Sequence, residues 1–239
     1  MKFETFIPNS LSPIPEKGPL SEHYINLKFN LLKEHHTKIE NLYSQEQREY
    51  KRMALEEEEI FGENQDGEDY CSDYWIYIRE LEETHLRLHR YSMILATFAY
   101  VETSFDKLCF EIEKRLNLPI SYKDLKSDGF TRSVSYIEKV TKLKVNQPSH
   151  IWENITTLKK LRHCIIHCSG DLSKLKEEQE NKQKKTRNKV LNTDGLGILD
   201  KDFLLVEDKY IQQIFEDVRV YLISISSRVD KELASMPLN

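Results

Sequence analysis

Two long stretches of the chain contain neither glycine nor proline, and they constrain the fold more than any other feature. The first extends from Ser21 to Phe61, and the second extends from Tyr74 to Leu116. Glycine and proline are the residues that most often interrupt helices, so these stretches predict two long helices. Ser21 is a suitable N-cap for the first helix, and Pro119 lies just beyond the end of the second.

Shorter helices are predicted over Thr131–Lys142, Ser149–His167 and Asp208–Leu233, the last with apolar residues at helical spacing. A clear turn signal, Asp194-Gly195, lies before this last helix, and we expect a small β-hairpin there. The chain contains only seven glycines and seven prolines, fewer than a β-rich domain needs for its turns. The sequence therefore predicts an all-α, antiparallel helical bundle with a small β-hairpin before the last helix.

The chain is expected to form one domain. Residues 1–20 hold four of the seven prolines and predict an extended arm. Residues 21–239 are expected to form a single helical domain, with a polar, lysine-rich insertion at about 172–189. No segment reaches the length of a membrane span, and the N-terminus lacks an apolar signal region, so we expect a cytoplasmic protein with no membrane partner. The four cysteines show no CxxC spacing and are expected to be free thiols.

Charge is distributed unevenly along the chain. The formal net charge is −5, yet residues 121–189 hold 16 Lys and Arg against 8 Asp and Glu. One basic region in an acidic chain can attract a polyanion. Charges on helical surfaces can also segregate in this way without any functional role.

Two opposite charges occur on the apolar faces of different predicted helices. Arg162 falls within the apolar arc of the helix 149–167, and Glu102 falls within the apolar stripe of the helix 74–116. A guanidinium in such a place needs a partner or a ligand, because it stays charged. We therefore expect Arg162 and Glu102 to meet, either as a structural ion pair or as part of a site.

The segment "LRHCIIHCSG" places Arg162 and His167 in an R-x4-H pattern near the end of a core helix. With the upstream segment "ILATFAYVETSFDKLC", which carries Glu102, it resembles the HEPN superfamily of ribonucleases and nucleic-acid-associated domains. The resemblance covers about residues 91–233. It implies a homodimer that cleaves RNA without metal or other cofactor, with the 2′-hydroxyl attacking the adjacent phosphorus.

The resemblance implies roles for particular residues. Arg162 and His167 are the expected catalytic residues, with Glu102 and His163 in support. Histidine can transfer protons near neutral pH, and arginine donates fixed hydrogen bonds to phosphate oxygens. The cations expected to contact the RNA backbone are Lys159, Lys160, Lys182, Lys184, Lys185 and Arg187. A role as a toxin or an anti-phage effector, with an antitoxin or another regulatory partner, is also implied only by the resemblance.

Alternatives remain open at this stage. The main one is a catalytically inactive HEPN-like bundle that binds nucleic acid or a partner protein. On an ideal helix Arg162 and His167 lie roughly 140° apart, which a long arginine, a distorted last turn or a dimer cleft could reconcile. The pairs His163/His167 and His85/His89 have metal-ligand spacing, but neither completes a ligand set, so no metal is expected. The i,i+4 spacing of Cys164 and Cys168 does not favour a disulfide.

Overall fold

The computed structural model describes residues 20–62, 72–127, 129–175, 180–200 and 202–236, with the backbone alone described for residues 180–184. Helices make up nearly all of it, which confirms the all-α class. In chain order the elements are α1 (Glu22–Phe61), α2 (Tyr74–Glu80), the π-helical turn η1 (Leu81–Leu86), α3 (Arg87–Leu116), η2 (Tyr122–Asp124), α4 (Gly129–Thr141), α5 (Ser149–Cys168), η3 (Leu172–Lys174), α6 (Glu180–Leu191), β1 (Leu196–Leu199), β2 (Phe203–Val206) and α7 (Asp208–Ser235).

The two stretches free of glycine and proline form the two longest helical runs, as predicted. Ser21 caps α1 by accepting a hydrogen bond from the Tyr24 backbone N–H at 3.3 Å. The second run comprises α2, η1 and α3 without a break, and it ends at Asn117, whose φ of 48° is left-handed. The π turn was not predicted. Such a turn accommodates one extra residue, and it changes which side chains of α3 face α1.

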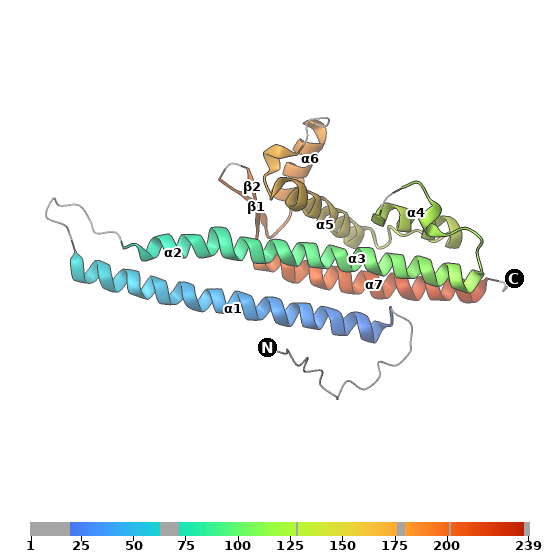
Figure 1. The fold of residues 1–239 in the computed structure, drawn as a ribbon, viewed down its shortest axis with the longest axis horizontal. Coiled ribbons are helices and arrows are strands. Elements are labelled where there is room, and N and C mark those ends of the chain that lie inside the picture. Colours follow the sequence, from blue (N-terminus) through green and yellow to red (C-terminus); the bar gives the residue numbers. More distant parts are fainter. Residues whose placement is uncertain (1–19, 63–71, 128, 176–179, 201, 237–239) are drawn as a thin grey trace, which may run out of the picture.

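The three longest elements lie side by side, and α4 and α5 pack across one side of them (Figure 1). Helix α1 runs opposite to α3, whereas α3 and α7 run parallel. An ion pair of 3.0 Å joins Arg115 and Asp230 at the C-terminal ends of α3 and α7. At their other ends, Arg90 donates to the carbonyl of Val206, just before α7.

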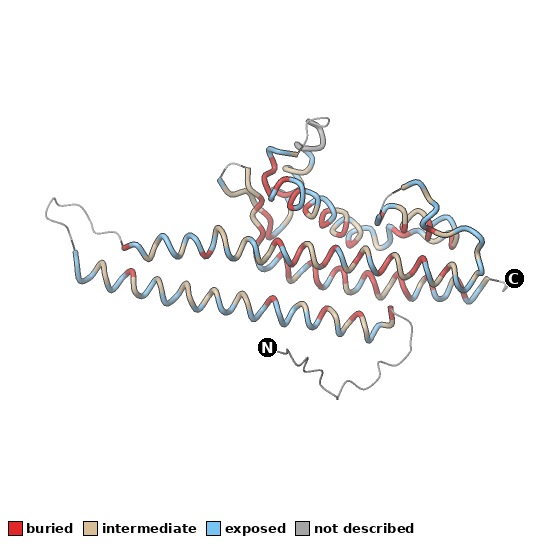
Figure 2. Tube along the Cα trace, viewed as in Figure 1, coloured by how far each residue is buried: buried red, intermediate tan, exposed pale blue. Residues whose placement is uncertain are grey.

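The core lies between α3, α5 and α7, where buried residues face inward along each helix (Figure 2). Phe98 and Phe105 of α3 and Tyr221 of α7 are among its largest fully buried side chains. The second half of α1 and helix α2 extend beyond this core as a two-helix projection (Figure 1). Ile60 of the projection is 75% exposed and Tyr77 is 50% exposed. The projection therefore contacts the rest of the fold mainly at the end nearest the core.

The predicted hairpin forms from β1 and β2, with Leu196 opposite Val206. Asp194-Gly195 lies before β1 and is not the connection between the strands, which follows Asp200 at φ 47°. The first turn of α3 holds β2 in place, because the Tyr91 hydroxyl donates to the carbonyl of Leu204 at 2.6 Å.

The remaining sequence expectations on organisation have mixed outcomes. Residues 1–19 of the expected arm lie outside the described residues. The expected polar insertion contains α6, and it is anchored at its start by Leu172, which is 1% exposed. None of the described helices is long and apolar enough to cross a membrane.

Candidate functional site

Helix α5 carries the R-x4-H pattern on its outer side. Its inner face packs into the core through five buried residues, Ile151, Ile155, Leu158, Leu161 and Ile165. Helical periodicity in the sequence assigns Ile166 to the same apolar arc as Ile165, but the side chain of Ile166 is 47% exposed. Ile166 is rotated by about 100° from Ile165 around the helix axis, in the direction away from the centre of the buried face. Ile166 therefore lies on the outer face with the histidines.

The end of α5 is fixed firmly to the rest of the fold. The helix stays α-helical to Cys168, and Ser169 follows in a left-handed conformation. Gly170 has a φ of 83°, and its carbonyl accepts a hydrogen bond from the Leu204 N–H of β2 at 2.8 Å. A Cβ added at Gly170 would lie 2.2 Å from the Tyr91 hydroxyl. Only glycine fits here, so the strand and α3 together set the position of the preceding histidines.

The motif residues lie together at this end of the helix. His163 and His167 are both exposed, and their ring centroids are 4.5 Å apart. Arg162 is half-buried. Among the residues that the structure describes, none forms a hydrogen bond or ion pair with its guanidinium. The five guanidinium N–H donors of Arg162 are thus available to an anion.

The electrostatic surroundings of His163 are basic. Partial burial lowers the pKa of His163, and the neighbouring His167 and Arg162 lower it further. The imidazole of His163 is therefore mainly neutral at pH 7, and a neutral imidazole can accept a proton. An anion bound here would meet a proton acceptor and a permanent cation at adjacent positions.

The expected meeting of Arg162 and Glu102 is wrong. Both residues are half-buried and fully described, yet no ion pair joins them. Glu102 lies instead beside the start of α4, where a Cβ added at Gly129 would be 3.3 Å from its Oε1 atom. Glu102 thus lies near the positive N-terminal end of α4, which partly compensates its charge.

The expected RNA-contacting cations fall into three groups. Lys160 and Lys185 are exposed. Lys159 is exposed too, and its ammonium donates to Thr131 Oγ1 at 2.8 Å. Arg187 forms an ion pair of 2.6 Å with Asp202. The side chains of Lys182 and Lys184 lie outside the described residues.

The cysteines of the motif belong to the core. Cys164 and Cys168 are buried free thiols that pack with Leu172, and Cys109 is also free and buried. Burial raises the pKa of the Cys164 thiol to about 12. The expectation of free thiols is thus confirmed for these three, and Cys71 lies outside the described residues. A thiol that stays protonated is a poor nucleophile and a poor metal ligand.

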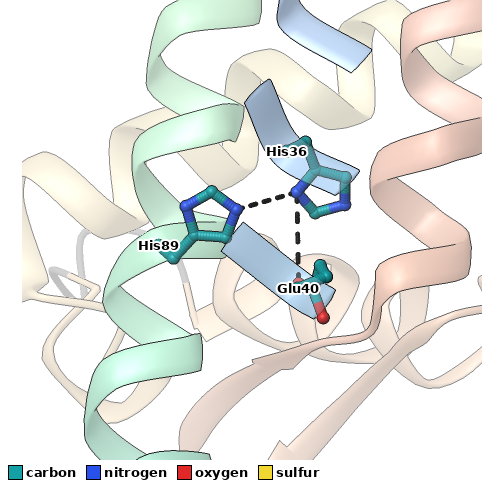
Figure 3. A group of neighbouring side chains, drawn as sticks. All are labelled: His36, Glu40 and His89. Carbon is teal, nitrogen blue, oxygen red and sulfur yellow. Dashed lines mark hydrogen bonds and ion pairs between the residues drawn. The ribbon is translucent and has the colours of Figure 1, made fainter. Parts of the chain in front are cut away.

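A second histidine cluster joins α1 and α3 (Figure 3). His36 of α1 is completely buried, and its Nδ1 lies 2.9 Å from Nε2 of His89 on α3. Glu40, one helical turn after His36, has its Oε1 4.0 Å from the same Nδ1. On the other side of the ring, His36 Nε2 lies 2.7 Å from Asp208 Oδ1 at the start of α7.

Sequence reasoning missed this cluster. The spacing of His36 and Glu40 is i,i+4, a visible signal, but their partner His89 is 53 positions from His36. His85 and His89 have metal-ligand spacing, but only His89 belongs to this cluster, and His85 is exposed and stacks on Tyr43. The π turn η1 contains His85 and ends before His89, so it alters the helical phase between the two.

Comparison of the chain with family models, with curated proteins and with solved structures found no match.

Proposed function

We propose that this protein is a metal-independent endoribonuclease of the HEPN type, with Arg162 and His167 as its catalytic residues. The observation that carries the proposal is the absence of a bonding partner for Arg162 among the described residues. The residue is half-buried on α5, its guanidinium has no hydrogen-bonding or ion-pairing partner in the part of the chain that the structure describes, and two exposed histidines are close to it in sequence. A structural arginine would be expected to bond a carboxylate, and Glu102 does not supply one.

The chemistry follows from the residue types. Arg162 donates hydrogen bonds to the phosphate oxygens, where negative charge grows as the 2′-hydroxyl attacks phosphorus. A histidine accepts the proton of that hydroxyl, and an acid returns a proton to the departing 5′-oxygen. The products are a 2′,3′-cyclic phosphate and a 5′-hydroxyl. His167 takes part in this proton transfer, and His163, one helical turn before it, has a supporting role.

The geometry favours a site completed by a second copy of the chain. Because α5 is regular to Cys168, Arg162 and His167 remain roughly 140° apart around the helix axis. A distorted last turn is therefore not the explanation for their convergence. Ile166 adds an exposed apolar side chain on the same outer side of α5, as a contact between copies would require. A homodimer would bring His167 of one protomer toward Arg162 of its partner.

RNA binding along this surface would depend on backbone charge. Lys160 and Lys185 are exposed, and the ion pair between Lys189 and Glu153 ties α6 to α5. This contact is near the N-terminal end of α5, and an RNA strand that follows the exposed lysines from there would extend along α5 toward the motif. A cytoplasmic toxin or defence role, restrained by an antitoxin or another regulatory protein, is part of the proposal.

The proposal is tested by incubating the purified full chain with RNA in EDTA and analysing the fragment ends. We expect cyclic-phosphate and 5′-hydroxyl ends. Arg162→Ala and His167→Ala should each lower the cleavage rate at least about 100-fold. His150→Ala is the matched control, because His150 is an exposed histidine at the opposite end of α5. Circular dichroism establishes that each variant is folded.

Two results would count against the proposal. One is the absence of cleavage by the wild-type protein, and the other is an unchanged rate in folded His167→Ala. The first would favour the inactive HEPN-like bundle that binds nucleic acid or a partner, and the second would remove His167 from the catalytic residues. If cleavage is observed, mixing the two inactive variants tests the composite site. Recovery of about a quarter of the wild-type activity is expected if mixed dimers contain one intact Arg162–His167 combination.

A further inference from the structure

The cluster at the junction of α1, α3 and α7 brings three electron-rich atoms together. They are Nδ1 of His36, Nε2 of His89 and a carboxylate oxygen of Glu40, all within 4.8 Å of one another. Figure 3 shows the two rings facing each other edge to edge, with Glu40 below. Their planes differ by only 13°.

The hydrogen bonds around the cluster fix the proton of His36 and leave its Nδ1 as an acceptor. Asp208 lies 2.7 Å from Nε2 of His36, and a carboxylate there keeps the proton on Nε2. Nδ1 of the same ring then accepts a hydrogen bond from Nε2 of His89 at 2.9 Å, and Oε1 of Glu40 lies 4.0 Å from it. If the proton of His89 moves to its other ring nitrogen, both imidazole nitrogens and the carboxylate oxygen present lone pairs to one space, which a divalent cation can occupy.

Glu40 is also held in place. Arg90 donates to both of its carboxylate oxygens, Nε to Oε1 at 2.8 Å and one terminal nitrogen to Oε2 at 2.7 Å. Each carboxylate oxygen has a second lone pair, so Oε1 can accept from Arg90 and still bind a cation. Outer partners that orient a ligating histidine and a ligating carboxylate are typical of metal sites. Here Asp208 and Arg90 occupy those two positions.

We infer that His36, His89 and Glu40 form a binding site for one divalent transition-metal ion, which fastens α1 to α3. Two imidazoles and one carboxylate suit Zn²⁺ and its neighbours, whereas Mg²⁺ and Ca²⁺ prefer oxygen ligands throughout. Three protein ligands leave one position of a tetrahedral ion for water. In tetrahedral sites the donor atoms lie about 3.3 Å apart. A shift of less than about 1 Å in each side chain would bring the three donor atoms from their present separations to this distance.

The protonation of His89 is compatible with this role. Burial lowers the pKa of His89 to about 4, and the nearby His36 contributes to the lowering. His89 is therefore neutral near pH 7. Binding requires its ring proton to reside on Nδ1 instead of Nε2, a change of tautomer with no net gain or loss of protons.

The test measures Zn²⁺ binding to the EDTA-treated, desalted full chain by titration calorimetry, with Co²⁺ absorbance as a second probe. We expect one Zn²⁺ per chain and a visible Co²⁺ spectrum of low coordination number. His89→Gln should weaken Zn²⁺ binding at least about 100-fold. The glutamine amide can still donate to His36, so this variant retains the hydrogen bond while losing a strong ligand. Glu40→Gln, in which an amide oxygen replaces a carboxylate, provides a second ligand variant if His89→Gln unfolds.

The matched control is the double variant H163A/H167A. It removes the other close histidine pair, an i,i+4 pair on an exposed helix face that could bind Zn²⁺ adventitiously. We expect it to bind Zn²⁺ like the wild-type protein. The inference is overturned if the wild-type chain binds no stoichiometric Zn²⁺, if folded ligand variants bind as well as wild type, or if binding disappears in H163A/H167A. Each of those results would leave a cluster in which a proton, and not a metal ion, joins His36 and His89.

Discussion

Two histidine pairs of this molecule, His163 with His167 and His36 with His89, differ in almost every respect except the residue type. His163 and His167 belong to one helix and face solvent, and the groups that shift the pKa of His163 are basic. His36 and His89 come from two helices, and carboxylates lie near both nitrogens of His36. The first pair suits an anionic ligand, whereas the second suits a cation. The difference shows that chemistry is set by the neighbours of an imidazole more than by the spacing of the pair.

The largest expected effect is a difference in cleavage rate between variants of His163 and of His167, which we call the outer pair. If the proposed ribonuclease uses His167 for proton transfer, His167→Ala should reduce RNA cleavage at least about 100-fold, whereas His163→Ala should reduce it less than about tenfold. Single-turnover rates with a short RNA measure both. Equal losses would mean that the two rings act as one unit and that the distinction between catalytic and supporting residue is wrong.

The second prediction concerns the turn that fixes the outer pair. Gly170→Ala forces a Cβ into the Tyr91 hydroxyl and a left-handed conformation onto alanine. Strain and overpacking together should lower the free energy of unfolding by about 3 kcal/mol. Urea denaturation measures the loss, with Gly62→Ala as a control. Gly62 also has a positive φ, but a Cβ there would meet nothing within 4 Å. A similar loss in both variants would rule out the contact with Tyr91 as the cause.

The third prediction compares the stability that each pair provides. His36→Ala removes a fully buried ring that contacts Phe215, and it leaves His89 and Asp208 without their partner. The free energy of unfolding in EDTA should fall by about 2–3 kcal/mol. His163→Ala, at an exposed position, should change it by less than about 0.5 kcal/mol. Equal values would show that the inner cluster does not hold α1 to the core.

The smallest effect tests the ion pair that the sequence predicts and the structure lacks. A buried Arg162–Glu102 pair would make Glu102→Gln cost about 3–5 kcal/mol, because the arginine would remain uncompensated. Since Glu102 instead lies near the start of α4, we expect a loss below about 1 kcal/mol. Denaturation at pH 7 distinguishes the two values. A loss near about 3–5 kcal/mol would instead indicate that Glu102 and Arg162 form a buried ion pair.

Sequence reasoning predicted features that depend on neighbours along the chain. The long helices and the ends of α5 follow from the positions of glycine, proline and apolar residues, and all were close to the observed bounds. The exposed position of Ile166 was missed because an apolar residue beside Ile165 was assigned to the same face. The distance between Glu102 and Arg162 depends on the packing of α3 on α5, which helical periodicity does not determine.

The inner cluster was beyond such reasoning for a similar reason. It requires the register of α1 against α3, the start of α7 and a π turn that changes the helical phase before His89. None of these is encoded by a local motif. The R-x4-H pattern, in contrast, is local, so the sequence could identify it, although the partner of Arg162 could not be identified.

The position of the inner cluster (His36, Glu40 and His89) lets it control the tilt of the projection formed by α1 and α2. Beyond Glu40, α1 continues to Phe61, a length of roughly 30 Å. The cluster lies where this projection leaves the core, so it is the point about which the projection would tilt. A tilt of about 5° there would move the tip by roughly 3 Å, given the helical rise per residue. Small changes in the distances among three side chains would therefore be amplified into a displacement as large as an atom at the far end.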